Sequence, residues 1–164
     1  MNAAWEIKTQ LFDVMRHMAA EMALGIPEEH FNVPRGGSNS PKWITGHLAL
    51  CMDLGLSLLG EPTDAIAEMM PTYGPGSPGG AVDDPRTCEE LVAHMRTVGD
   101  ALKAKVSAAT EDQLAQPQST PFLAKELPTV GGILAHVYTT HIALHAGQLS
   151  QIRRELGMPS QLKV

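Results

Sequence analysis

Near the C-terminus the sequence reads His136-Val-Tyr-Thr-Thr-His141-Ile-Ala-Leu-His145-Ala-Gly147-Gln148-Leu-Ser-Gln-Ile-Arg-Arg154, and this stretch decides the fold. Apolar residues and two histidines recur in it at the three-to-four spacing of one helix face. The stripe comprises Leu134, Val137, His141, His145, Gln148, Ile152 and Leu156. The pattern predicts an amphipathic helix from about residue 128 to 156, ended by Gly157-Met-Pro159.

Three earlier segments have the same spacing and predict helices over residues 3–24, about 41–59 and about 87–109. The inner face expected for the first is Trp5, Leu11, Phe12, Met15, Met18 and Met22. The second follows the cap Ser40-Pro41, and its expected inner face is Ile44, His47, Leu48, Cys51, Leu54 or Gly55, and Leu58. The third begins at the capping box Thr87-Cys-Glu-Glu90.

Four amphipathic helices with almost no strand signal predict an all-α fold, a four-helix bundle. Residues 60–85 are rich in proline and glycine and predict a long crossover between the second and third helices, with a short helical segment near 63–70. Long loops in compact domains often form lids, but the role of this crossover stays open. We interpret residues 28–39 as a linker, 110–114 as a turn and 116–127 as an excursion that contains proline.

The overall composition excludes several functional classes. A chain of 164 residues, 43% hydrophobic and 18% charged, predicts a single domain over residues 1–164. A net charge of −6 and scattered basic residues argue against a nucleic-acid or anionic-membrane partner. Cys51 and Cys88 form no CxxC motif, and the sequence has no apolar run of ~18 residues. The first residues lack the charged start and apolar run of a signal peptide, so we expect none. We therefore expect a cytoplasmic protein with reduced thiols.

Three histidines lie on predicted inner faces, where hydrophobic residues are expected. His141 and His145 are four residues apart and can point to one spot, and His47 lies on the second helix. Facing helices of a bundle assemble metal sites in this way, and neutral imidazole is a common ligand of Zn, Ni and Fe. The alternative is that they are hydrogen-bonded core residues. Outside this group, His136 is expected to point away from the site, and the remaining histidines are expected at the surface or flanks: His17, His30 and His94.

Two segments together resemble the DinB-like superfamily, which includes the YfiT-like proteins and thiol-dependent S-transferases. They are Trp43-Ile-Thr-Gly46-His47-Leu-Ala and His141-x3-His145-x-Gly147-Gln148. The resemblance implies that His47, His141 and His145 bind a divalent metal ion. It also implies an up-down-down-up bundle, a homodimer, and a low-molecular-weight thiol as cosubstrate. Ala146 departs from the family, where this position is often basic.

Other residues near this site leave alternatives open. Either Cys51 or a water molecule could complete the coordination. Gln148 could orient a metal-bound water, bond to a histidine ring nitrogen, or bond across helices. We interpret Gly147 as permitting close helix approach, and Tyr73 as a loop residue that either closes over the site or lies at the surface.

Two functional hypotheses follow. The first is a metal-dependent hydrolase or a thiol-dependent S-transferase or isomerase, in which the metal activates a water or a thiol. The second is a non-catalytic metal-binding or stress-response dimer, in which the metal is structural or regulatory. An open coordination position that faces a cleft would favour the enzyme.

Overall fold

The computed structural model describes residues 3–161, and its regular structure is helical. The helices are α1 (Ala3–Leu24), α2 (Glu28–Phe31), α3 (Pro41–Leu58), α4 (Asp64–Tyr73), α5 (Cys88–Ala108), α6 (Glu111–Ala115), α7 (Val130–His136), the π-helix η1 (Val137–His141) and α8 (Ile142–Glu155). Within residues 3–161 no β-strand forms, although an isolated bridge joins Pro117 and Thr129. The all-α prediction is confirmed.

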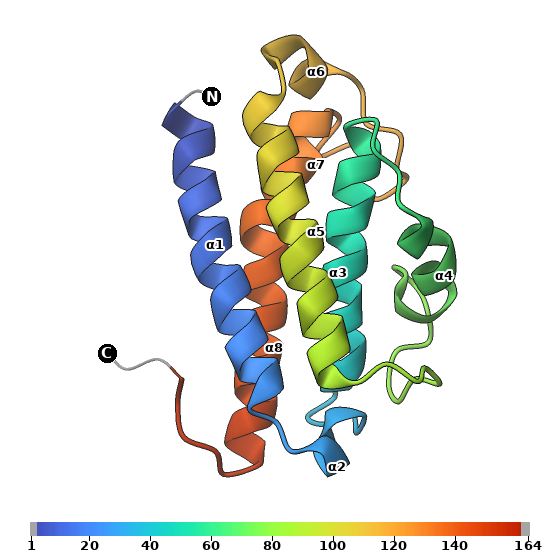
Figure 1. Cartoon of the computed structure of the whole chain (residues 1–164), viewed down its shortest axis with the longest axis vertical. Coiled ribbons are helices and arrows are strands. Elements are labelled where there is room, and N and C mark those ends of the chain that lie inside the picture. Colours follow the sequence, from blue (N-terminus) through green and yellow to red (C-terminus); the bar gives the residue numbers. More distant parts are fainter. Residues whose placement is uncertain (1–2, 162–164) are drawn as a thin grey trace.

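The long helices α1, α3 and α5 lie side by side with a rod formed by α7, η1 and α8 (Figure 1). Contacts at the two ends of α1 show that it is parallel to this rod. Near the start of α1, Trp5 packs edge-on against Tyr138, and at its end the Met22 carbonyl accepts a hydrogen bond from Arg153. Helices α3 and α5 run in the opposite direction (Figure 1).

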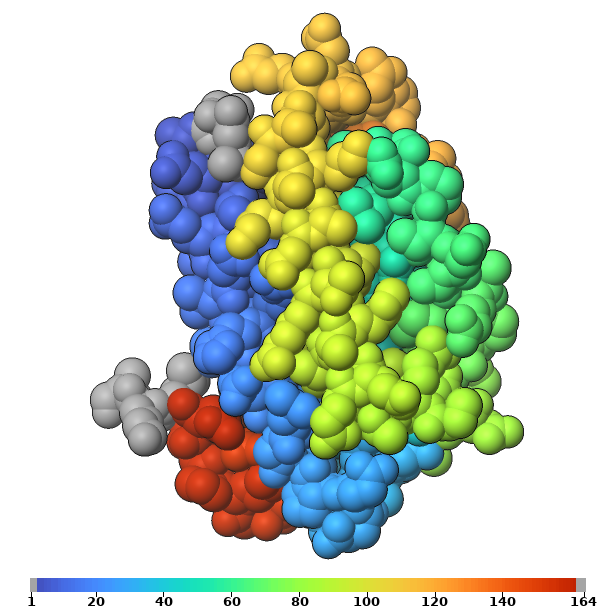
Figure 2. Space-filling view, in the orientation of Figure 1, coloured from blue at the N-terminus to red at the C-terminus, as the bar shows by residue number. Residues whose placement is uncertain are grey.

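Helix α3 is buried on nearly every side because α5, α4 and the C-terminal rod surround it. Its first turn is stabilised as the sequence predicts, since the Ser40 hydroxyl accepts a hydrogen bond from the Trp43 amide and Pro41 occupies the first turn. The space-filling view shows the crossover, in green at the right edge, packed closely against the rest of the molecule (Figure 2). A helix enclosed in this way can place polar side chains out of contact with bulk water.

Several predicted boundaries agree with the structure and others need correction. The Thr87 capping box forms at the start of α5. The last helix begins two residues later than expected, because the Thr129 side chain caps it by accepting a hydrogen bond from the Gly132 amide. Residues 28–31 and 111–115, expected as a linker and a turn, form the short helices α2 and α6. A second capping box, Thr110 with Gln113, explains α6.

The inner face predicted for α1 is wrong at one position. Trp5, Phe12 and Met22 are buried as expected, but Leu11 is 49% exposed. Leu11 instead forms an outward apolar stripe with Ile7 and Val14, which are 59% and 56% exposed. The apolar residues of α1 therefore cover two faces, and only one of them packs against the core.

Within residues 3–161 no helix is long and apolar enough to cross a lipid bilayer.

A buried carboxylate on α3 ties α4 and α5 to the core. Asp53 is fully buried; its Oδ1 accepts a hydrogen bond from the Thr63 hydroxyl (2.6 Å), and its Oδ2 lies 2.7 Å from Nε2 of His94. Thr63 immediately precedes α4, and His94 lies on α5. Asp53 thus links three helices.

Replacing Asp53 with alanine is expected to destabilise the protein by about 2–3 kcal/mol, because two hydrogen-bonding groups lose a buried partner. Urea unfolding would measure the change. Asp64→Ala is the matched control, since this exposed carboxylate in the first turn of α4 contributes about 0.3–1 kcal/mol through the helix dipole. Equal losses in the two variants would contradict the role given to Asp53.

Candidate metal centre

The structure brings the three predicted histidines together. His47 comes from α3, His141 from the last position of η1 and His145 from α8. Each offers a ring nitrogen within 4.8 Å of the others, and all three are buried. Among residues 3–161 this is the only group of three or more histidine, cysteine or acidic residues with the spacing of a metal site. The spatial arrangement on which the metal hypothesis depends is therefore present.

The separation between ring nitrogens of His47 and His141 suits a shared metal ion. Nε2 of His47 lies 3.1 Å from Nε2 of His141. Two imidazoles bound to tetrahedral Zn²⁺ at about 2.0–2.1 Å have nitrogens about 3.3–3.4 Å apart. The rings of His141 and His145 meet nearly edge to face, with centroids 4.7 Å apart. Three imidazoles thus converge without stacking on one another.

Hydrogen bonds orient two of the three rings. Nδ1 of His47 lies 2.7 Å from the carbonyl oxygen of Tyr73. Because a carbonyl only accepts, Nδ1 carries the proton and Nε2 keeps its lone pair. Nδ1 of His145 lies 2.7 Å from Oε1 of Gln148, which leaves Nε2 of His145 free in the same way. Of the alternatives for Gln148, the structure therefore shows a bond to a histidine ring nitrogen. Nδ1 of His141 is buried and has no partner within the described part of the chain.

Burial keeps the three imidazoles neutral. Desolvation is the main cause in each case, and it lowers the pKa of His141 to about 2 and that of His145 to about 4. It also lowers the pKa of His47, while the hydrogen bond to the Tyr73 carbonyl raises it by a smaller amount. The neutral form is the one that binds divalent metals. The site is therefore ready to bind a cation at neutral pH.

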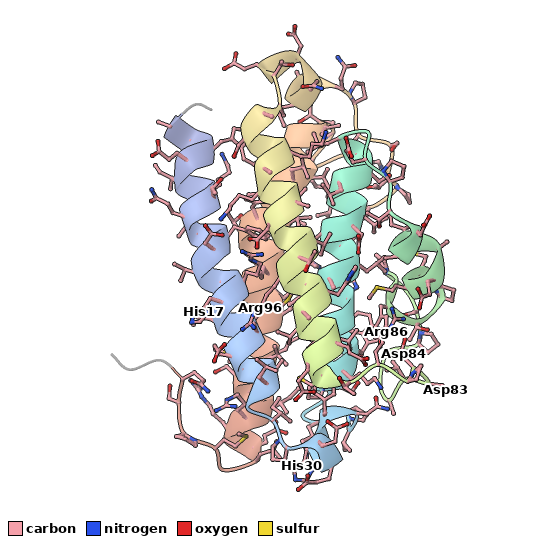
Figure 3. The ribbon with its side chains drawn as sticks, viewed as in Figure 1. His17, His30, Asp83, Asp84, Arg86 and Arg96 are labelled. Atoms are coloured by element: carbon pink, nitrogen blue, oxygen red, sulfur yellow. The ribbon has the colours of Figure 1, made fainter. Side chains whose placement is uncertain are left out.

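The crossover supplies the partner of His47. Tyr73 is fully buried at the end of α4, so the surface interpretation is wrong. Its ring packs on Gly46. A Cβ atom added at Gly46 would lie less than 3.0 Å from the ring, closer than Cβ atoms come to other atoms in proteins. The guanidinium of Arg86 lies over the Tyr73 ring, 5.7 Å from its centroid, and Arg86 pairs with Asp84 (Figure 3). The crossover is thus a structural support of the site.

A π-helix changes the position of His136. In an α-helix, residues five apart differ in direction by about 140°, so the sequence predicts that His136 points away from His141. The structure contradicts this prediction, because η1 follows His136 directly and a π-turn brings residues five apart to the same side. The ring centroids of His136 and His141 are 5.4 Å apart. Nδ1 of His136 bonds to the Thr140 hydroxyl at 2.6 Å, and its buried Nε2 has no partner among residues 3–161.

Two further α3 residues shape the site. The Trp43 indole stacks on the His47 ring, with centroids 4.4 Å apart and planes at 13°, and it donates a hydrogen bond to Ser77 of the crossover. Sγ of Cys51 lies 3.7 Å from Nε2 of His47. Burial raises the pKa of the Cys51 thiol to about 12, so it stays protonated unless a metal binds it.

A cavity of about 560 Å³ opens onto the site, and His47, His141, His136 and Cys51 line it. Apolar side chains form most of the walls: Leu54, Leu58, Met70, Phe122, Ile133 and Val137. Ser119 and Thr120 contribute hydroxyl groups from the excursion between α6 and α7. The excursion, predicted only as a connection, therefore forms a wall of the cavity.

The remaining histidines lie elsewhere, as predicted. His17 is on the outer side of α1, and His30 lies on α2 at the lower end of the molecule, beside Arg35 (Figure 3). His94 contacts Asp53. Gly147 does not permit close helix approach within the chain, because a Cβ there would meet nothing within 4 Å. Sequence reasoning missed Trp43 and His136 as site residues. The sequence did contain a signal for Trp43, because it lies four residues before His47 and therefore on the same face of the helix.

A protein-family model matches most of the chain. The sequence model described as the DinB superfamily matches residues 11–149, which include all three histidines and most of the chain. A comparison with curated proteins found none that matches.

Proposed function

Because the chain belongs to the DinB superfamily, we propose that it is an enzyme that uses a divalent metal ion bound by His47, His141 and His145. The observation that carries this proposal is the cavity of about 560 Å³ with His47 and His141 in its wall. A structural metal needs no such access, whereas a catalytic one keeps a position open to substrate.

The residues of the chain have separate tasks in this proposal. His47, His141 and His145 hold the ion through Nε2, and Tyr73 and Gln148 keep two of the rings in the required orientation. When bound, the ion would lower the pKa of a water or a thiol and so supply a nucleophile. His136 lies beside His141 in the cavity wall, and its Nε2 is buried without a partner among residues 3–161. The apolar walls exclude bulk water. Hydrolysis and thiol-dependent transfer or isomerisation both fit this arrangement.

The proposal includes the fold topology and oligomeric state that the family implies. Helices α1 and α8 run in one direction and α3 and α5 in the other (Figure 1), which supports the up-down-down-up four-helix bundle. The exposed apolar stripe of Ile7, Leu11 and Val14 on α1 supports a homodimer, because a second copy would remove these side chains from water.

The test of the proposal is metal-dependent turnover. We expect protein expressed with added zinc, nickel or iron to contain about one ion per chain by elemental analysis. We expect it to hydrolyse 4-nitrophenyl butyrate, or to join the sulfur of butane-1-thiol to 1-chloro-2,4-dinitrobenzene with release of chloride and a proton, with loss of activity on chelation and recovery on metal addition. The helical circular dichroism should persist after chelation, because the hydrophobic core does not depend on the site. Helix loss on chelation would favour a structural metal instead.

The second candidate, a non-catalytic metal site, is favoured by one observation. Sγ of Cys51 is close enough to His47 for both to bind one ion, and a fourth protein ligand would close the site. Burial raises the pKa of the free Cys51 thiol, so binding to the ion would require this thiol to lose its proton.

Replacing Cys51 with serine separates the two candidates. We expect Cys51→Ser to keep the full metal content, with an affinity for the metal ion within about threefold of the wild type. In this proposal a water or substrate molecule, and not Cys51, completes the coordination. Competition with a chromophoric chelator would measure the affinity. Cys88→Ser is the control, since this buried thiol lies at the start of α5 and outside the cavity lining. A much larger loss of affinity in Cys51→Ser would identify Cys51 as a ligand.

A further inference from the structure

The walls of the cavity restrict the chemistry of its ligand. The chain contains 12 basic and 18 acidic residues, yet none of the described residues that line the cavity is Asp, Glu, Lys or Arg. A charged group that enters an apolar site without a partner loses its hydration and gains nothing in return. The cavity therefore selects against charge everywhere except beside the histidines.

Three histidines of the cavity wall lie together, and the hydroxyl groups of Ser119 and Thr120 are the side-chain oxygens of the lining. His47 and His141 lie side by side, and the unpartnered Nε2 of His136 lies next to them. Leu54, Leu58 and Met70 form apolar wall, and along α3 Leu54 and Leu58 lie about two and three turns beyond His47. Phe122 adds an aromatic surface, with its ring centroid 5.8 Å from that of His136. A molecule that matches this distribution is polar at one end and apolar along its body.

We infer that the cavity binds a small organic molecule with an uncharged, apolar body and a single polar head that lies against His47, His136 and His141. The inference rests on the proposed function, because the bound ion would neutralise an anionic head such as a thiolate. A volume of about 560 Å³ lies within the range of ordinary ligand pockets. Peptide-like thiols, which carry carboxylate and ammonium groups along the body, do not match these walls.

Binding of alkyl thiols to the metal-loaded protein tests the inference. Trp43 lines the cavity, so its fluorescence reports occupancy. We expect the affinity to rise about fourfold for each methylene from ethanethiol through butane-1-thiol to hexane-1-thiol, the factor for transfer of a CH₂ group from water. We expect 6-mercaptohexanoate, in which a carboxylate replaces the terminal methyl, to bind on the order of 100-fold more weakly than hexane-1-thiol. Equal affinities along the series, or tighter binding of the carboxylate, would overturn the inference.

The same test without metal separates this inference from the proposed function. In metal-free protein, 1-hexanol should bind more tightly than 6-hydroxyhexanoate, because the walls alone discriminate between them. If no metal binds but this preference holds, the proposed function fails and the inference about the cavity stands. If metal binds but neither pair is distinguished, the inference fails and the metal site stands.

Two variants place the same positive charge inside and outside the cavity wall. Leu58 lies at the C-terminal end of α3, where a lysine can extend toward solvent and is favoured by the helix dipole. Leu58→Lys should improve binding of 6-mercaptohexanoate at least tenfold relative to hexane-1-thiol. Leu144→Lys introduces the same charge at a residue that is 61% exposed and lies outside the cavity lining, and it should leave the ratio unchanged. Identical ratios in the two variants would overturn the inference.

Discussion

His141→Ala is expected to abolish stable binding of a divalent metal ion, whereas His136→Ala is expected to retain it. His141 offers Nε2 at 3.1 Å from Nε2 of His47 and lies next to His145, so its loss leaves two ligands. His136 also lines the cavity, but its nitrogens lie outside the group that can share one ion. Elemental analysis after gel filtration would measure retention. Equal retention in the two variants would refute the ligand assignment.

Gln148→Ala is expected to lose an amount of metal affinity between the losses in His136→Ala and His141→Ala. Loss of a hydrogen-bond partner of a metal-binding histidine typically lowers metal affinity about 10–100-fold. We therefore expect Gln148→Ala to weaken binding by that factor and His141→Ala by more. The order His141→Ala, Gln148→Ala, His136→Ala, from largest to smallest loss, would support both the ligand set and the orienting role of Gln148. A loss in Gln148→Ala as large as that in His141→Ala would argue against this division of roles.

Gly46→Ala is expected to destabilise the protein by about 1–3 kcal/mol, because the new methyl group overlaps the buried ring of Tyr73. Displacing Tyr73 also removes its carbonyl from Nδ1 of His47. We therefore expect metal affinity to fall about 10–100-fold in the same variant. Thermal or urea unfolding of metal-free protein would measure the first effect, and chelator competition the second.

Gly147→Ala is the matched control for this substitution. It changes the same residue type inside a helix, but the added methyl group meets nothing within 4 Å. Alanine is better than glycine in a helix interior by about 0.5–1 kcal/mol, so this variant should be more stable than the wild type. Metal affinity should not change. If both glycine variants shift stability in the same direction, packing of Tyr73 on Gly46 is not what distinguishes the two positions.

Much of the fold could be predicted because its signals are local. The start of α3 depends on Ser40 and Pro41, and the start of α5 on the Thr87 capping box, so the contacts that define each boundary lie within a few residues. The inward positions of His47, His141 and His145 follow from helical periodicity in the same way. Periodicity failed for Leu11, because α1 has apolar residues on two faces and the packing of the other helices decides which one is buried.

The sequence by itself determined the helices and three histidines on their inner faces, because helix caps and periodicity depend on neighbouring residues. Only the tertiary structure decided how these histidines are oriented and what they face. The Tyr73 carbonyl reaches His47 across 26 residues of chain, and the cavity joins walls from α3, α4, α7 and the excursion. The π-turn that moves His136 beside His141 replaces the α-helical pattern at one position. Such features arise from packing between distant segments, which local spacing does not encode.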